Sequence, residues 1–248
     1  MSVRKPVIDC AIAEWMWFGK DEGRKDKHIA PNGATTVNKG PKARPYPRKE
    51  TVEPYAGRVG DYWLSISSKD YDHLLKNFAK SKGKLDGTVN LPWSTAFISY
   101  CMQMAGAGTD FPYSSGHAAW IVKSIKNKNA SKLNAALVGY RPGEIVLRPG
   151  DIVANTRQSG VTYDNAVAKG WFPSHSDIVV EVDLKNRKAY AIGGNVGQSV
   201  SKVEVPISAS GKIAGSSGLL VHIQNNIVHK PLVVADISAT SLVNAKVG

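Results

Sequence analysis

The sequence predicts an α+β fold, because hydrophobic residues change their spacing partway along the chain. Over the first half, apolar residues recur every three or four positions, which is the spacing of amphipathic helices. The second half consists of short runs rich in Val and Ile that Gly, Pro, Asn and Asp separate, which is typical of strands joined by turns. With 248 residues, of which 42% are hydrophobic, the chain is long enough to enclose a large core.

Five segments carry the helical spacing. They are residues 8–19, 52–66, 74–78, 92–106 and 117–128. The first helix is expected to stop at Gly19. Its apolar stripe is predicted to consist of Ile8, Ile12, Trp15 and Phe18.

The fourth helix has Pro92 near its first turn and Gly106 at its end, which is the asymmetry that helices favour. Its buried stripe is predicted to consist of Phe97, Ile98, Cys101 and Met102. This segment is therefore expected to lie deep in the core.

The second half is predicted to form a mainly antiparallel sheet, because its apolar runs are short and separated by turn residues. The predicted strands are residues 144–147, 150–155, 176–183, 188–194, 201–207 and 218–225.

Residues 20–50 and the tail 231–248 show neither the helical nor the strand spacing of apolar residues. Residues 20–50 are rich in Lys, Gly, Pro and Asn, so a long basic surface loop is expected there. We therefore divide the chain into an N-terminal helix and basic loop that wrap the main domain (1–51), the main domain itself (52–230) and a peripheral tail (231–248).

The net charge of +12 produces a positive field that favours anionic partners such as nucleic acid, anionic lipid or an acidic cell-wall polymer. The sequence contains no helix-turn-helix, zinc-finger or ribonucleoprotein motif. No specific nucleic-acid partner is therefore expected, and a solvated basic surface is the favoured interpretation.

Several classes of protein are excluded by composition. No apolar run approaches the ~18 residues of a membrane span, and Asp9 and Glu14 interrupt the N-terminal apolar run, so neither a membrane span nor a signal peptide is expected. Cys10 and Cys101 can form at most one disulfide. The histidines lack ligand spacing and residues 193–197 lack a phosphate-binding pattern, so no metal and no cofactor are predicted.

Three polar residues stand at positions suited to nucleophilic catalysis. Ser94 is at the start of a predicted helix, where the helix dipole and free backbone N–H groups can hold an oxyanion. His175 stands at the start of one predicted strand, if the strands are taken as 175–182 and 188–195, and Asn195 lies on the next one. A base and an orienting amide must reach the nucleophile from elsewhere in the fold.

The spacing of the two strands predicts that His175 and Asn195 are neighbours. If residues 183–187 form the turn, the hairpin is centred on Lys185, and positions 175 and 195 are both ten residues from that centre. Directly opposed residues of an antiparallel pair lie within reach of a hydrogen bond. The amide oxygen of Asn195 would then fix the tautomer of the imidazole.

Four motifs resemble those of NlpC-like and CHAP-type cell-wall amidases and peptidases. Ser-Thr-Ala-Phe-Ile at 94–98 resembles the Cys-Ser-Gly-Phe-Val signature that opens their catalytic helix. Arg-Pro-Gly-Asp-Ile-Val at 148–153 resembles their Pro-Gly-Asp-Leu-Val strand, and His-Ser-Asp-Ile-Val-Val at 175–180 resembles their His-Val-Gly-Ile-Tyr strand. Gly-Gly-Asn at 193–195 stands in the place of their third polar residue.

The chain more closely resembles a bacterial family of unknown function allied to that group. The resemblance rests on WSTAFISY at 93–100, Gly-His at 116–117, HSDIV at 175–179 and GGNV at 193–196. It covers about residues 55–205. It implies a papain-like domain in which N-terminal helices pack on a small antiparallel sheet.

The resemblance implies hydrolysis of an amide bond in the peptide part of peptidoglycan. Ser94 would attack, His175 would transfer the proton, and Asn195 would orient the imidazole. The family nucleophile is a cysteine, whose thiol is partly ionised by a neighbouring imidazole, whereas a serine needs a base to remove its proton during attack. Serine at this position indicates either a working serine hydrolase or a site that has lost catalysis.

Peptidoglycan or another anionic cell-wall polymer is the expected partner. Because no signal peptide is expected, the protein would be made in the cytoplasm and exported to the periplasm or wall of a target bacterium. A contractile secretion apparatus, or release as a phage-type lysin, would fit such a role. A toxin of this kind would also require a cognate immunity protein.

Three further residues are candidates to support the site. His117 is interpreted as a helix cap or core contact, with lining of the cleft near Ser94 as the alternative. Asp177 is two residues from His175 and so on the same face of the strand, where it either supports the site or lies at a solvated edge. Trp93 directly precedes Ser94 and is expected to line or support the cleft.

Two other functions remain open. A binding module could keep the fold and the cleft without catalysis. A glycan hydrolase could be centred on Glu14, since a glutamate among aromatic residues can act as a general acid. The alternative for Glu14 is an ordinary ion pair with a nearby Arg or Lys.

Overall fold

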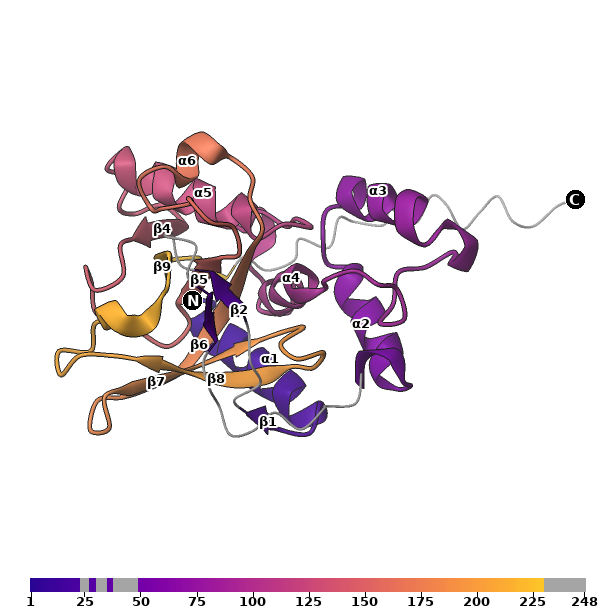
Figure 1. Cartoon of the computed structure of the whole chain (residues 1–248), viewed down its shortest axis with the longest axis horizontal. Helices are drawn as coiled ribbons and strands as arrows, with labels where there is room; N and C mark the ends of the chain where they lie inside the picture. The colour runs from indigo at the N-terminus through magenta and orange to yellow at the C-terminus, as the bar shows by residue number, and fades with distance from the viewer. Residues whose placement is uncertain (23–26, 30–34, 38–48, 230–248) are drawn as a thin grey trace, which may run out of the picture.

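A seven-stranded sheet with helices packed against it forms the centre of the molecule (Figure 1). The structure is a computed structural model, and it describes residues 1–22, 27–29, 35–37 and 49–229. The strand order is β1-β8-β7-β6-β5-β9-β4. Neighbouring strands are antiparallel except β1 and β8, which run parallel. The prediction of an α+β fold with a mainly antiparallel sheet is confirmed.

The strands of this sheet are β1 (Asp21–Glu22), β4 (Leu137–Tyr140), β5 (Ile152–Thr156), β6 (Ser174–Asp183), β7 (Lys188–Gly193), β8 (Ser201–Pro206) and β9 (Val221–Asn225). A separate hairpin is formed by β2 (Lys27–Ile29) and β3 (Thr35–Val37). The backbone of β2 lies close to β5 (Figure 1).

The α-helices of the described chain are α1 (Arg4–Trp17), α2 (Tyr55–Trp63), α3 (Ser68–Phe78), α4 (Ser94–Met104), α5 (Ala118–Asn129) and α6 (Ala166–Lys169). Helices α1 and α4 pack on β6 and β7, while α5 covers β4 and β9. Helices α2 and α3 lie on the opposite side of the molecule from the turn that joins β6 to β7 (Figure 1). The predicted stripe of α4 is confirmed, since its four residues are fully buried: Phe97, Ile98, Cys101 and Met102.

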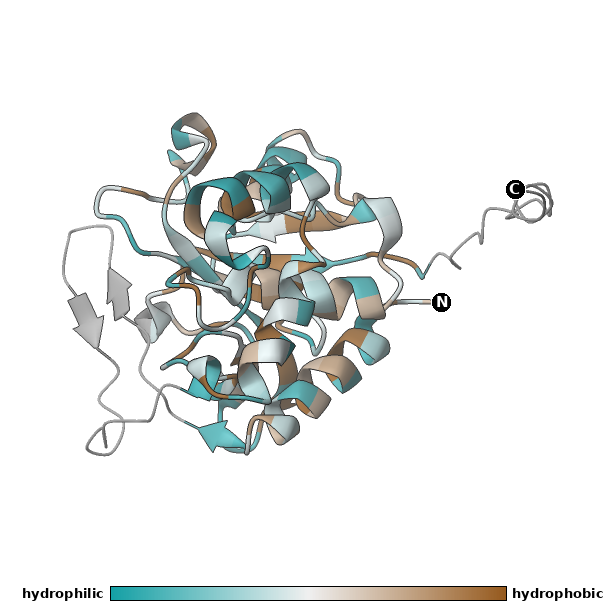
Figure 2. Ribbon diagram, turned by 90° about the vertical axis from the view of Figure 1, so that its right-hand side faces the viewer, coloured by the Kyte–Doolittle hydropathy of each residue, from teal (hydrophilic) through white to brown (hydrophobic). Residues whose placement is uncertain are grey.

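Hydrophobic side chains pack on both sides of the sheet because strand residues alternate between its faces. Ile152 and Ile178 belong to the main core that the helices share, whereas the next residues, Val153 and Val179, belong to a smaller cluster. The helices carry both hydrophilic and hydrophobic residues (Figure 2), as expected for elements that bury one face. The central strands are therefore packed against hydrophobic side chains on both faces.

The buried face of α1 differs from the predicted one. The buried residues of this segment are Val7, Ala11, Glu14 and Phe18, so the prediction is confirmed only for Phe18. Ile8, Ile12 and Trp15 are only half-buried. The reason is that Glu14 makes a buried ion pair with Arg58 of α2, with Nη2 and Oε1 2.5 Å apart, so a charged residue faces inward. A hydrophobicity pattern alone cannot anticipate such a pair.

One predicted strand is wrong. Residues 144–147 join no strand of the described sheet, although Val146 forms a single bridge with Lys212. The edge of the sheet is instead formed by β4, whose four residues are all buried. In β4, Gly139 lets α5 approach closely, because a Cβ there would lie 2.6 Å from Oγ of Ser124.

Within residues 20–50, where the sequence predicts only a loop, the structure places the short strands β1, β2 and β3. The remainder of the basic loop and the tail 231–248 lie outside the described residues. Among the helices that are described, none has the length and apolar character needed to cross a bilayer.

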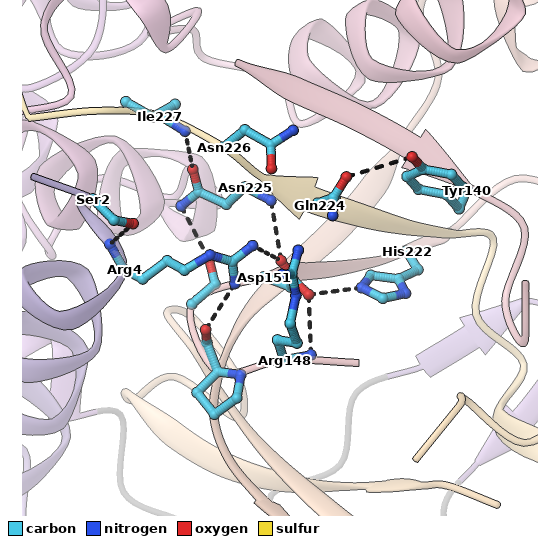
Figure 3. A network of polar contacts seen from close by, with 12 residues as sticks. Ser2, Arg4, Tyr140, Arg148, Asp151, His222, Gln224, Asn225, Asn226 and Ile227 are labelled. Atoms are coloured by element: carbon cyan, nitrogen blue, oxygen red, sulfur yellow. Dashed lines mark hydrogen bonds and ion pairs between the residues drawn. The ribbon is translucent and has the colours of Figure 1, made fainter. Parts of the chain in front are cut away.

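A buried carboxylate ties the N-terminal helix to the centre of the sheet (Figure 3). Asp151 is fully buried, and its Oδ1 accepts from Nη2 of Arg4 at 2.6 Å and from the backbone N–H of Asn225 at 3.1 Å. Its Oδ2 accepts from the backbone N–H of Arg148 at 3.0 Å and lies 2.9 Å from Nε2 of His222. Asp151 thus joins α1, β5 and β9.

The partners of Asp151 also set its charge state. Burial alone would raise the pKa of Asp151, but the hydrogen bond and charge of His222, together with the charge of Arg4, hold it below its ordinary value. The carboxylate is therefore ionised at neutral pH and compensated by the groups around it.

Candidate active site

Ser94 is the first residue of α4, and its hydroxyl contacts a histidine. Oγ of Ser94 lies 2.7 Å from Nε2 of His117. Ser94 is 7% exposed and His117 is 3% exposed, so the pair is largely shielded from water. The side chain of Trp93, the N-cap residue of α4, makes no capping hydrogen bond. The first backbone N–H groups of the helix, which begin at Ser94, have no intrahelical acceptors.

The loop before α5 places His117 opposite Ser94. Asp70 of α3 holds this loop, because its Oδ2 accepts from the backbone N–H of Ser115 at 2.7 Å and from Oγ of Ser114 at 3.0 Å. The hydroxyl of Thr95 donates to the carbonyl of Ser115 at 3.2 Å. These contacts link α3, α4 and the start of α5, and they hold the backbone before His117 in place opposite Ser94.

The environment of His117 favours its neutral form. Burial lowers its pKa well below the ordinary 6.5, and the charges of His175 and Arg157 act in the same direction. A neutral imidazole can accept a proton from a hydroxyl. His117 is therefore in the state that a general base needs at neutral pH.

Packing, rather than a second hydrogen bond, orients the His117 ring. The imidazole of His117 contacts the rings of Trp120 and His175 edge-on, with centroids 4.9 Å and 5.3 Å away. Among the described residues, Nδ1 of His117 has no hydrogen-bond partner. The site thus differs from a triad in which a carboxylate or amide holds the second nitrogen of the base.

His175 and Asp177 form the second half of the site. Nε2 of His175 lies 2.8 Å from Oδ1 of Asp177, and both side chains are buried. This contact favours the supporting role for Asp177 over the solvated edge. Ser94, His117, His175 and Asp177 therefore form one continuous chain of contacts.

Replacing Gly193 with alanine is expected to break the His175–Asp177 contact. A Cβ at Gly193 would lie 1.8 Å from Oδ1 of Asp177 and 3.0 Å from Nε2 of His175. The carboxylate would have to move, at a cost of about 1–3 kcal/mol in the free energy of unfolding. Urea unfolding measures this loss, and Gly215→Ala is the matched control because nothing lies within 4 Å of its Cβ. Equal stability of the two variants would contradict the expectation.

The predicted pairing of His175 with Asn195 is not formed. The β6–β7 ladder follows the predicted register at Ile178 and Ile192, but it ends there, and a bulge shifts the register nearer the turn. Asn195 lies beyond β7 with a positive φ of 57°. Counting from a turn gives the register but does not show where the ladder ends or that Asn195 leaves the strand in a left-handed conformation.

Asn195 instead contacts the segment that leads into α4. With its amide oriented to satisfy its neighbours, its oxygen accepts from the backbone N–H of Trp93 at 3.2 Å, and its nitrogen donates to Oε2 of Glu50 at 3.1 Å. Trp93 is buried and also donates to Oε2 of Glu50 from its indole nitrogen at 2.9 Å. Asn195 and Trp93 therefore support the start of α4, a role that the sequence predicts for Trp93 but not for Asn195.

Glu14 lies in a different cluster. Both of its oxygens accept from Arg58, and Oε2 also accepts from the hydroxyl of Tyr62 at 2.6 Å. Arg58 also contacts Asp61, with 3.3 Å between Nη1 and Oδ2. This arrangement favours the ion-pair interpretation of Glu14 over the general-acid one, because Arg58 and Tyr62 donate three hydrogen bonds to its carboxyl group.

Two further residues act on the candidate site and are not singled out by the sequence. Glu50 bridges Trp93 and Asn195, and Arg157 acts on the charge of His117. Neither residue stands in a motif, so no sequence signal marks them. No group of three His, Cys, Asp or Glu side chains within the described ranges is arranged to hold a metal ion.

Residues 52–228 match the model of the protein family described as "Uncharacterized protein conserved in bacteria (DUF2272)". This region contains Ser94, His117, His175, Asp177 and Asn195. No curated protein and no solved structure matches the chain. Because the family model covers well over half of its length, the chain belongs to this bacterial family.

Proposed function

We propose that this protein is a serine hydrolase that cleaves amide bonds in the peptide part of peptidoglycan. The observation that carries the proposal is the 2.7 Å contact between Oγ of Ser94 and Nε2 of His117 at the N-terminus of α4. A hydroxyl next to a neutral imidazole and beside free N–H groups is the arrangement that acyl transfer needs.

In the proposed reaction, Oγ of Ser94 attacks the carbonyl carbon of the amide. The hydroxyl proton passes to Nε2 of His117 as the C–O bond forms. His117 then donates this proton to the leaving nitrogen as the C–N bond breaks, which leaves an acyl-serine. Water, deprotonated by the same imidazole, hydrolyses the ester and returns Ser94 to its hydroxyl form.

The start of α4 supports the oxyanion in this mechanism. The first N–H groups of a helix lack intrahelical acceptors and carry the positive end of the helix dipole. One donor of this region, the N–H of Trp93, is taken by Asn195. The N–H groups from Ser94 onward are the proposed oxyanion donors.

The second imidazole has a positioning role in the proposal. His175 packs edge-on against His117 and is itself held by Asp177. This revises the role that the sequence motif implies for His175, since the hydrogen bond to Ser94 comes from His117. A helix that bears the nucleophile packs on a strand that bears His175, which supports the proposal of a papain-like arrangement.

The substrate class rests on the motif resemblance and on charge. A net charge of +12 suits an anionic wall polymer. In the same proposal, a hydrolase used against other bacteria would be delivered by a secretion apparatus or released as a lysin. The producing cell would then hold a cognate immunity protein.

A fluorophosphonate that phosphonylates activated serines tests the proposed nucleophile without a substrate. We expect mass spectrometry to find the adduct on Ser94. The rate of labelling should rise with pH through the pKa of His117 and be on its plateau at neutral pH, because burial holds that pKa well below its ordinary value.

Two variants make this test specific. Ser94→Ala should abolish labelling. Ser99→Ala should not change it, since Ser99 is a fully buried serine of the same helix whose hydroxyl has no partner among the described residues. An unlabelled wild-type protein that is folded and binds peptidoglycan would favour the non-catalytic binding module.

A further inference from the structure

Trp171 is the most exposed of the six tryptophans, with 70% of its surface accessible. The next most exposed, Trp17, is 43% accessible. A single exposed aromatic side chain does not by itself indicate a binding site. Trp171 indicates one here because it lies next to the candidate active site.

The indole of Trp171 lies where the two histidine-bearing segments meet. Its Nε1 is 3.1 Å from the position that a Cβ on Gly116 would take, and Gly116 directly precedes His117. Along the chain, Trp171 is four residues before His175. The edge of the indole therefore rests on the backbone beside the Ser94–His117 pair, while most of its surface faces solvent.

The backbone around Trp171 is held on both sides. The N–H of Trp171 donates to the carbonyl of Lys169 at 2.8 Å. The next residue, Phe172, is buried in the main core, and the carbonyl of Pro173 accepts from the N–H of Arg157 at 2.8 Å. A fixed aromatic surface loses little conformational entropy when a ligand packs on it.

We propose that Trp171 is the platform on which a sugar ring of the peptidoglycan glycan strand stacks while the attached peptide enters the site. This inference rests on the proposed function. The face of a pyranose ring presents C–H groups, which pack on the negative face of an indole. The wall peptide is attached to a sugar and has no aromatic side chains of its own. The sugar ring, rather than the peptide, is therefore the group expected to stack on Trp171.

The test measures binding in the Ser94→Ala background, where cleavage does not interfere. The probes are purified peptidoglycan sacculi in a sedimentation assay and the tetramer of N-acetylglucosamine in a calorimetric titration. Trp171→Ala should weaken both interactions by about tenfold, the loss typical of an exposed aromatic anchor. Trp171→Phe should retain most of the affinity.

Phe78→Ala is the matched control, because Phe78 is an exposed aromatic residue (57%) at the end of α3. It should bind both probes like the parent. Unchanged binding by Trp171→Ala, or a parent that binds neither probe, would overturn the sugar platform. If the wild type cleaves no wall peptide but binds the tetramer through Trp171, the hydrolase proposal fails and the platform stands. Wall-peptide cleavage together with unchanged binding by Trp171→Ala would remove the platform alone.

Discussion

Replacing His117 with alanine is expected to lower kcat/KM for a peptidoglycan-derived peptide by about 10²–10⁴-fold, the usual contribution of a general base. The reason is the 2.7 Å contact between its Nε2 and Oγ of Ser94, together with burial that keeps the imidazole neutral. The measurement is steady-state hydrolysis followed by chromatography of the released fragments.

Two other histidines make this prediction discriminating. His175→Ala should lower the rate less than His117→Ala, because Nε2 of His175 is bound to Asp177. His73→Ala should leave the rate unchanged, since His73 is exposed on α3. A larger loss for His175→Ala than for His117→Ala would contradict our assignment and restore the strand histidine as the base.

The second large effect is expected at Asp151, away from the candidate site. Asp151→Ala should lower the free energy of unfolding by about 3–5 kcal/mol, because it leaves the buried parts of Arg4 and His222 without their common anion. Asp151 joins the N-terminal helix to β5 and β9 (Figure 3). Urea unfolding followed by circular dichroism measures the change.

The matched control for Asp151 is Asp164, which also pairs with an arginine, Arg141, but at the surface. Asp164→Ala should leave the unfolding midpoint nearly unchanged, as is usual for exposed ion pairs. An Asp151→Ala protein that unfolds at the same urea concentration as the Asp164→Ala protein would contradict the anchoring role.

The same network predicts the direction of acid destabilisation. The folded-state pKa of Asp151 is lower than the ordinary 3.8, so the unfolded chain binds its proton first as the pH falls. Its stabilising contribution is therefore complete above about pH 3.8 and is lost as the pH falls through the folded-state pKa. In Asp151→Ala, this part of the pH dependence should disappear.

Hydrophobic periodicity predicted the parts of the fold in which apolar residues mark the buried face. The apolar stripe of α4 and the strands β5 to β9 follow from pattern alone, because alternation or helical spacing reports directly on packing. The face of α1 could not be predicted, since Glu14 is buried through Arg58, a residue 44 positions away. The edge strand β4 contains Gly139, which weakens a strand signal although α5 requires it.

The sequence singles out most of the residues of the candidate site, but it does not predict which of their side chains contact one another. Ser94 at a helix start and Asp177 beside His175 follow from local spacing. The contact of His117 with Ser94 depends on a loop held by Asp70 of another helix, which no local pattern encodes. Asn195 does not pair with His175 because the β6–β7 ladder ends at Ile178 and Ile192 and Asn195 itself is left-handed.

Digestion of purified peptidoglycan by the wild type and by Ser94→Ala, with mass spectrometry of the soluble products, tests the central claim most directly. We expect fragments with newly formed peptide or amide ends from the wild type and none from Ser94→Ala. Cleavage that persists in Ser94→Ala, or products with new sugar ends, would contradict the proposed serine hydrolase.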